Sequence, residues 1–189
     1  MEPVHVFAMA GSLRKRSYNR ALLRAASELL PDDMTMDIFD LVPLPLFNVD
    51  VEAQGVPESV QNFHERMAAA DAILIATPEY NWSVPGVLKN AIDWASRSMA
   101  DGRPSPLDSA PLAIIGGAGR LGGVRAQDHL RQIVLHNDMR VLNKPQYMLP
   151  SIWNHFDDDL NLVDEDARAR LAKVLIALRD WTRQLQHFA

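Results

Sequence analysis

Cysteine is absent from the 189-residue sequence. Without a thiol the chain forms no disulfide, offers no thiolate nucleophile and binds no metal through sulfur. The six histidines show no H-E-x-x-H or comparable spacing, and the acidic run at 157–159 fits a solvated loop. We therefore expect no metal site.

The sequence also lacks an excess of basic residues, because its 19 lysines and arginines are outnumbered by 24 aspartates and glutamates, which gives a formal net charge of -5. Nucleic-acid binding needs a broad basic surface, so that class of partner is not expected. No uncharged apolar run approaches the roughly 20 residues of a membrane span. The first residues lack the basic and long apolar regions of a secretory signal. We expect a cytoplasmic protein that binds neither nucleic acid nor membrane.

Short apolar runs alternate with amphipathic stretches along the chain. Strands are predicted at five places, over residues 4–10, 34–41, 71–77, 109–117 and 139–145. Helices are predicted at five more, over residues 20–30, 57–70, 86–99, 123–138 and 164–188. The proline-rich segment 42–57 is predicted to be a surface loop.

Strands that alternate with helices indicate an α/β fold with a parallel sheet. Residues 1–189 are predicted to form one domain, a doubly wound sandwich with a five-stranded parallel sheet and helices on both faces. Such sheets bind ligands at the carboxyl ends of their strands, near the topological switch point. Three loops fall at that edge, namely residues 10–19, 77–86 and 116–124.

The first of these loops gathers cations although the chain is acidic. Gly11 permits a tight turn after the first strand, and the loop leads into a helix whose N-terminal amides favour an anion. Four side chains with hydrogen-bond donors there predict a phosphate site: Ser12, Arg14, Ser17 and Asn19. The alternative is that the serines and asparagine only cap the helix. Three other cations fit a solvated helix face: Lys15, Arg20 and Arg24.

Two nucleotide motifs do not apply. G-x-x-x-x-G-K-[ST] is missing, so hydrolysis of a nucleoside triphosphate is not expected. Gly117, Gly119 and Gly122 match G-x-G-x-x-G, but they follow the fourth strand rather than the first, and Asp138 precedes a strand instead of ending one. We reject this match as a dinucleotide fingerprint. Its glycines indicate only that backbone approaches a flat or bulky group closely.

Residues 77–97, TPEYNWSVPGVLKNAIDWASR, follow the third strand with Tyr80 and Trp82 and then enter a helix. Aromatic side chains beside exposed amides suit a planar ring that needs stacking and in-plane hydrogen bonds. Together with GSLRKRSYN and GGAGRLGGVRAQDHLRQ, this stretch resembles the NADPH-dependent FMN reductases, the group that contains bacterial quinone and chromate reductases. The resemblance runs from the first strand through LNKP and implies a flavodoxin-like fold.

The resemblance implies FMN as the cofactor and NAD(P)H as the hydride donor, with quinones or similar small molecules as acceptors. It assigns the FMN phosphate to Ser12, Arg14, Ser17 and Asn19. It assigns the edge of the isoalloxazine, largely through backbone groups, to Pro78, Glu79, Tyr80 and Asn81, and the pyrimidine side to Gly117. No catalytic acid or base is nominated, because the flavin performs the chemistry. A homodimer or homotetramer is also implied.

Two other functions stay open, an electron carrier of flavodoxin type and a noncatalytic flavin-binding regulator. The sequence shows no extended acidic docking stripe, which disfavours the carrier. A single open face above the ring predicts ping-pong kinetics, since donor and acceptor need the same position. The choice between NADH and NADPH, the physiological acceptor and the role of residues 146–163 are left unassigned.

Overall fold

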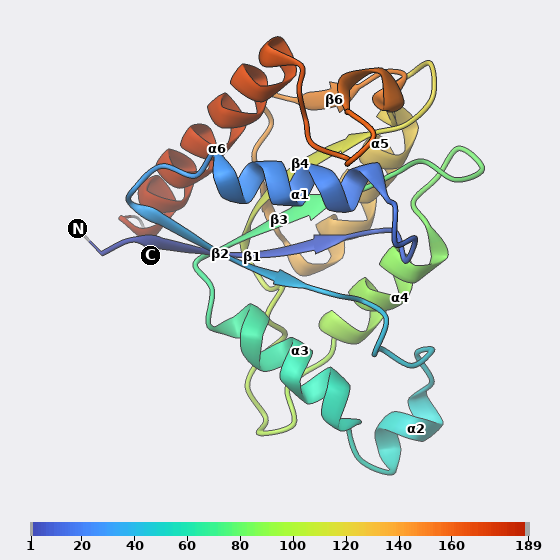
Figure 1. Ribbon diagram of the computed structural model, residues 1–189. Helices are drawn as coiled ribbons and strands as arrows, with labels where there is room; N and C mark the ends of the chain where they lie inside the picture. The colour runs from blue at the N-terminus through green and yellow to red at the C-terminus, as the bar shows by residue number, and fades with distance from the viewer. Residues whose placement is uncertain (1, 188–189) are drawn as a thin grey trace.

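Parallel strands form one sheet at the centre of the computed structural model, which describes residues 2–187 (Figure 1). The strands are β1 (Val4–Ala10), β2 (Met34–Phe39), β3 (Ala72–Ala76), β4 (Pro111–Gly117), β5 (Arg140–Val141) and β6 (Tyr147–Leu149). Their order is β2-β1-β3-β4-β5, with β6 also paired to β4, and every pairing is parallel. This order confirms the predicted flavodoxin-like fold, and it reverses direction between β1 and β3.

Helices cover both faces of the sheet. They are α1 (Tyr18–Glu28), α2 (Val49–Ala53), α3 (Glu58–Ala68), α4 (Gly86–Ala95), α5 (Val124–Ile133) and α6 (Glu165–Gln186), with 3-10 turns η1 (Val134–Asn137) and η2 (Ile152–His155). One core cluster joins the sheet to α1 and α6, and the other joins it to α3, α4 and α5. Figure 1 shows α1 and α6 above the sheet and α3 and α4 below it.

Strand β1 shows why these apolar runs form central strands. Val6 and Ala8 belong to the core cluster on one face, whereas Phe7 and Met9 belong to the cluster on the other face. All four are fully buried. A strand covered on both faces needs apolar side chains at every position, so it carries a continuous apolar run rather than an alternating pattern.

The predicted fifth strand is divided in two. Val141 of β5 pairs with Leu112 near the start of β4, and Leu149 of β6 pairs with Gly117 at its end. Pro145 lies between the two short strands, where a residue without an N–H cannot donate to a ladder. The single run predicted over 139–145 is therefore wrong in its extent, and both short strands pair with β4.

Several helix boundaries also differ from the prediction. Helix α1 begins at Tyr18, earlier than predicted, because the Ser17 hydroxyl accepts the Arg20 N–H at 3.4 Å and caps it. The short helix α2 lies inside the predicted loop 42–57. Helix α6 ends at Gln186, and Phe188 of the predicted closing helix lies outside the described residues.

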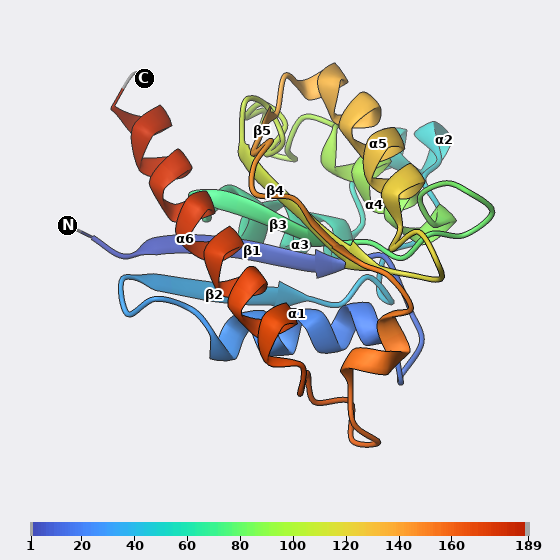
Figure 2. The same ribbon diagram turned by 90° about the horizontal axis from the view of Figure 1, so that it is seen from above.

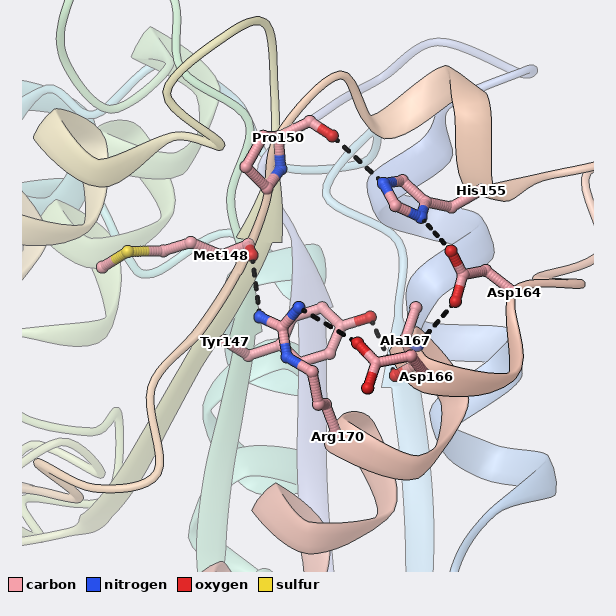
Figure 3. Close-up of polar contacts among 8 residues, drawn as sticks. All are labelled: Tyr147, Met148, Pro150, His155, Asp164, Asp166, Ala167 and Arg170. Carbon is pink, nitrogen blue, oxygen red and sulfur yellow. Dashed lines mark hydrogen bonds and ion pairs between the residues drawn. The ribbon is translucent and has the colours of Figure 1, made fainter.

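The imidazole of His155 makes polar contacts with both ends of the segment between β6 and α6 (Figure 3). His155 Nδ1 lies 2.6 Å from an Asp164 carboxylate oxygen, and its Nε2 lies 3.1 Å from the Pro150 carbonyl oxygen. Asp164 also caps α6 by accepting the Ala167 N–H at 2.9 Å. That backbone bond, followed by the bond to His155, holds the pKa of the Asp164 carboxyl below its usual value.

The other end of β6 is held by Arg170 of α6. Its guanidinium donates to the Met148 carbonyl at 3.1 Å and lies 5.4 Å from the centre of the Tyr147 ring (Figure 3). Tyr147 is fully buried and donates its hydroxyl to the Ala167 carbonyl at 3.3 Å. Burial raises the pKa of the Tyr147 hydroxyl above its usual range. These contacts fix β6 against the end of β4, close to the candidate site.

Among the described residues, no helix combines the length and the apolar character that crossing a membrane requires.

An ion pair joins the edge strand β2 to α3. Arg66 binds both carboxylate oxygens of Asp37, with Nε at 2.7 Å from one of them, and its guanidinium lies 4.9 Å from the centre of the Phe39 ring. The Arg66 hydrogen bonds are the main reason that the pKa of the Asp37 carboxyl is lowered. The folded state therefore favours the ionised carboxylate.

We expect Asp37→Asn to lower the free energy of unfolding at pH 7 by at most about 1 kcal/mol, because both partners are partly exposed. The pKa of Asp37 is lower in the folded than in the unfolded chain, so its contribution is complete above the unfolded value of about 4. The contribution disappears as the pH falls through the folded pKa. Urea unfolding across this pH range measures the effect.

Asp32→Asn is the matched control, since Asp32 is exposed and forms no ion pair with any described residue. A stability difference between wild type and Asp37→Asn that stays constant in acid contradicts the proposed contribution of the ion pair.

Candidate functional site

The three predicted loops meet at the carboxyl edge of the sheet, where β1, β3 and β4 end side by side (Figure 2). Backbone bonds set their spacing. The Gly11 N–H donates to the Ala76 carbonyl at 2.9 Å, and the Thr77 N–H donates to the Ile115 carbonyl at 3.0 Å. At Gly11 a β-carbon would lie only 3.2 Å from the Leu88 side chain, so α4 packs directly beneath the first loop.

The first loop presents backbone amides that have no acceptor in the protein. Within the described residues, five of them make no hydrogen bond: those of Ser12, Leu13, Lys15, Arg16 and Ser17. They precede the N-terminus of α1, where the helix dipole adds partial positive charge. A run of free amides at a helix start is an anion-binding concavity.

Two buried hydroxyls flank these amides. Ser12 and Ser17 are each only 4% exposed. Ser12 Oγ accepts the Arg14 N–H at 3.4 Å, and Ser17 Oγ accepts the Arg20 N–H at 3.4 Å. Since each oxygen acts as an acceptor toward the backbone, each hydroxyl proton remains available to donate. The Arg14 side chain is exposed and forms no ion pair among the described residues.

Other cations of this segment point elsewhere. Arg20 binds the Asp40 carboxylate at 2.7 Å, and Arg24 donates to the Leu160 carbonyl at 3.1 Å. Arg16 donates to the Asp158 carbonyl at 2.6 Å. The side chains of Arg20 and Arg24 thus bind other parts of the protein. The prediction of a solvated helix face did not include these partners.

Asn19 does not face the loop. Its side-chain NH₂ donates to the Gly117 carbonyl at 3.0 Å, and its Oδ1 accepts the Gly117 N–H at 3.1 Å. A β-carbon at Gly117 would lie 2.5 Å from Ile152 Cδ1, so η2 fills the space beside this glycine. The structure therefore pairs two residues that the sequence assigned to different parts of the cofactor. Nothing in the sequence signals that pairing.

The second loop forms a tight two-residue turn. Tyr80 and Ser83 exchange backbone hydrogen bonds of 3.0 Å, while Asn81 and Trp82 adopt φ values of 50° and 66°. Two left-handed residues in succession make a type I′ turn, which is costly for a bulky side chain such as Trp82. Tyr80 is half-exposed, and its hydroxyl lies 3.4 Å from Ser12 Oγ. Pro78 is buried beside Gly11.

The Glu79 side chain has a structural partner that the sequence did not reveal. Its carboxylate accepts the N–H groups of Arg125 and Ala126 at 3.0 and 3.3 Å. These are the second and third amides of α5, whose N-cap is Gly123 and has no side chain to cap it. Glu79 therefore serves as the missing cap from a different loop, using Oε2 for both amides.

Arg125 is the further residue that sequence reasoning missed. Its guanidinium lies 4.1 Å from the centre of the Trp82 ring and 3.6 Å from a Glu79 carboxylate oxygen. Ser83 Oγ lies 3.0 Å from His129 Nδ1, one turn further along α5. Cation–π stacking and these polar contacts hold the turn against α5, although Trp82 is 68% exposed.

The geometry suits a phosphate joined to a planar, acceptor-rich ring. The first loop supplies free amides and hydroxyl protons for the phosphate. The amides of Asn81 and Trp82 also make no hydrogen bond among the described residues, and they stand beside the half-exposed Tyr80 ring. Isoalloxazine offers oxygen and nitrogen acceptors along one edge and flat faces for stacking. Sheets of this strand order hold FMN at the β1/β3 switch point.

The model of a protein family described as NADPH-dependent FMN reductase matches residues 4–154, a span that includes all three loops. The chain belongs to this family. Members are oxidoreductases that use FMN together with NAD(P)H, so the predicted enzyme class and cofactor are confirmed. The family match does not test the individual site residues.

Similar proteins come from bacteria and plants. An NAD(P)H-dependent FMN reductase from Pseudomonas aeruginosa is 46% identical, with 98% of each chain covered. An NADPH:quinone oxidoreductase from Arabidopsis thaliana is 43% identical, with 97% of this chain and 94% of the relative covered. Among solved structures, FerB, a flavoenzyme NAD(P)H:(acceptor) oxidoreductase from Paracoccus denitrificans, matches with a TM-score of 0.85 and 32% identity, covering 96% of this chain and 98% of FerB.

We expect Asn19→Ala to lower the free energy of unfolding by about 1–3 kcal/mol, because it leaves the buried N–H and C=O of Gly117 unpaired. Urea unfolding without added flavin measures this loss. Asn62→Ala, which removes an exposed amide from α3, is the control and changes stability by less than about 0.5 kcal/mol. An Asn19→Ala protein as stable as wild type contradicts the role assigned to this pair.

Proposed function

We propose that this chain holds FMN across the loops after β1, β3 and β4, and that it transfers reducing equivalents from NAD(P)H to quinone-like acceptors by a ping-pong mechanism. The observation that carries the proposal is the row of free amides and buried hydroxyls at 12–17 beside the half-exposed Tyr80 ring. A 2-hydroxy-1,4-benzoquinone reductase from a Burkholderia species is 38% identical to this chain, which supports a quinone as the acceptor class.

Some residues of the three loops contact FMN in this proposal, and others hold the loops in position. In this proposal the phosphate is bound by the loop amides together with Ser12, Arg14 and Ser17. Asn19, which the resemblance assigned to the phosphate, instead supports the loop through its hydrogen bonds to Gly117. Pro78, Glu79, Tyr80 and Asn81 border the ring, with Glu79 acting through its backbone. When bound, FMN supplies the two-electron chemistry between donor and acceptor.

No side chain in the three loops is placed to act as a general acid or base. Glu79 Oε2 accepts the amides of both Arg125 and Ala126, and its Oε1 lies 3.6 Å from the Arg125 guanidinium, so this carboxylate is committed to contacts within the protein. The protein's contribution is therefore to orient the ring and to exclude water from one of its faces. Donor and acceptor then use the other face in turn.

We also propose that the chain works as a homodimer or homotetramer. Leu46 is 83% exposed although its neighbours are held firmly. The Pro45 carbonyl accepts N–H groups of Asn90 and Trp94 at 2.9 Å each, and the Phe47 N–H donates to Asn90 at 2.7 Å. A rigid loop that presents an apolar side chain to solvent is typical of an interface. The cytoplasm, which holds pools of NAD(P)H, is the expected location.

The phosphate loop predicts selectivity for FMN over riboflavin. Each hydrogen bond to a charged group contributes about 1.5–3 kcal/mol, so riboflavin should bind about 10- to 1,000-fold more weakly. Ser17→Asp adds a negative charge beside the phosphate and should weaken FMN binding at least as much. Asp remains a good helix cap, so α1 is kept. Titration of the apoprotein, followed by flavin fluorescence, measures both affinities.

Ser98→Asp introduces the same charge at an exposed position far along the chain and serves as the control. Equal affinities for riboflavin and FMN in the wild-type protein would refute phosphate recognition by this loop.

Shared use of one open face predicts parallel lines in double-reciprocal plots at several quinone concentrations. Quinone in excess should inhibit competitively against NAD(P)H. Under anaerobic conditions and without an acceptor, the holoprotein should consume one equivalent of NAD(P)H per bound FMN. Intersecting lines together with no anaerobic consumption of NAD(P)H are incompatible with the ping-pong mechanism.

A further inference from the structure

A hollow lies between β1 and β2, whereas the proposed flavin site lies where β1 and β3 end. The hollow has a volume of about 200 Å³ and opens between the carboxyl ends of β1 and β2, next to α1. Its lining includes Ser12, Arg20, Leu23, Arg24, Ile38 and Asp40. Ser12 also belongs to the phosphate loop, so the hollow adjoins the flavin site directly. Both lie at the end of the sheet toward which β1 and β2 point, since the lining includes Ala10 and Phe39, the last residues of these strands.

The hollow carries an excess positive charge. Arg20 and Arg24 lie one helical turn apart on α1, where like charges repel each other. Asp40 is the one carboxylate among the described residues that line the hollow. One of its oxygens accepts a hydrogen bond from the Arg20 guanidinium at 2.7 Å, and the other accepts the Val42 N–H at 3.1 Å. Arg24 forms no ion pair within the described part of the chain and donates to the neutral Leu160 carbonyl. An anion is the missing partner.

The hollow also has an apolar side. Ile38, at the end of β2, is 41% exposed there and supplies its accessible apolar surface. A flat aromatic base can cover such a surface while a phosphate reaches Arg24. The hollow is smaller than the roughly 300–1,000 Å³ of sites that enclose whole ligands, so it suits one end of a larger molecule. Phosphate plus purine is the chemistry of a phosphorylated adenosine.

The position in the fold agrees with this chemistry. In doubly wound sheets that bind dinucleotides, an acid near the end of the second strand contacts the ribose 2′-hydroxyl of NAD, whereas an arginine nearby accommodates the 2′-phosphate of NADP. Asp40 directly follows β2, but both of its oxygens are engaged, one by Arg20 and the other by the Val42 N–H. Arg24 is therefore the charged group left for a phosphate. No glycine fingerprint is needed, because the loop after β1 is reserved for the phosphate of the flavin.

We propose that this hollow binds the 2′-phosphoadenosine end of NADPH, with Arg24 as the phosphate contact and Arg20 positioned beside it by Asp40. The site makes NADPH a better donor than NADH. The inference rests on the proposed function only in taking the reduced dinucleotide as the donor. A different source of the same chemistry is the AMP half of FAD, which would continue from the flavin phosphate across Ser12.

The first test measures binding without turnover. Isothermal titration of the FMN-loaded protein with 2′,5′-ADP should give saturable binding, whereas 5′-AMP should bind at least about tenfold more weakly for want of one charge-assisted contact. Arg24→Gln should weaken 2′,5′-ADP by a similar factor. Arg140→Gln removes the same charge at β5, on the opposite edge of the sheet, and should leave binding unchanged.

The second test uses kcat/KM. Arg24→Gln should lower kcat/KM for NADPH about tenfold and leave that for NADH within about twofold, so the preference for NADPH disappears. An unchanged NADPH-to-NADH ratio, or 2′,5′-ADP bound equally by wild type and Arg24→Gln, overturns the proposal. If neither dinucleotide reduces the holoprotein, the proposed function fails, and the titration with 2′,5′-ADP still decides whether the hollow binds its ligand.

A third arm separates the two sources of phosphorylated adenosine. If Arg24→Gln weakens the binding of FAD to the apoprotein without changing the affinity for FMN or for 2′,5′-ADP, the hollow belongs to FAD and the NADPH assignment is wrong. Equal FAD affinities for wild type and Arg24→Gln, together with weakened 2′,5′-ADP, support the NADPH assignment.

Discussion

Asn19 and Gly117 lie 98 positions apart in the sequence, and two hydrogen bonds between them join the first loop to the end of β4. The pair is buried, so neither bond competes with water. On one side of this link stand the free amides that face the proposed phosphate, and on the other stands the loop that leads to α5. Because Gly117 has no side chain, Ile152 packs against it, and the same link sets the position of η2.

A second set of contacts joins the loop after β3 to α5. Glu79 caps α5 across a gap between loops, and Arg125 stacks on Trp82. The third loop is thereby tied to the second, as the first is tied to β4. All three loops take their places from contacts with one another, which is why the site holds its shape without a regular secondary structure of its own. The cost is local, in the left-handed backbone of Asn81 and Trp82.

Much of the fold could be predicted from the sequence, because the strong signals were local. The apolar runs of β1, β3 and β4 and the amphipathic repeat of α6 each lie within one segment, and the structure confirms them. The prediction failed where the outcome depended on partners. Whether residues 139–149 form one strand or two depends on which positions of β4 they pair with. Helix α2 has only five residues and lies inside a loop, so its sequence pattern is too short to predict it.

The site divides in the same way. Sequence motifs and the family resemblance pointed to three loops, and the structure brings these loops to one edge of the sheet, with Ser12 and Ser17 beside amides that make no hydrogen bond among the described residues. The motifs and the resemblance missed the partners of Asn19 and Glu79, because a side chain's use as a ligand contact or as a structural cap depends on residues far away in the chain. Arg24 illustrates the same limit. Its spacing on α1 indicated a solvated face, and only the fold reveals the hollow that it shares with Asp40.

The split edge of the sheet has a consequence for the protein's behaviour at high concentration. A long, flat, unpaired edge strand is a template on which another chain can add a strand, and it is a common start of aggregation. Here β5 has two residues and β6 has three, and they lie at opposite ends of β4 with Pro145 between them. A foreign strand finds no continuous ladder there to extend. The interruption that defeats a simple strand prediction thus also guards this edge against intermolecular β-sheet growth.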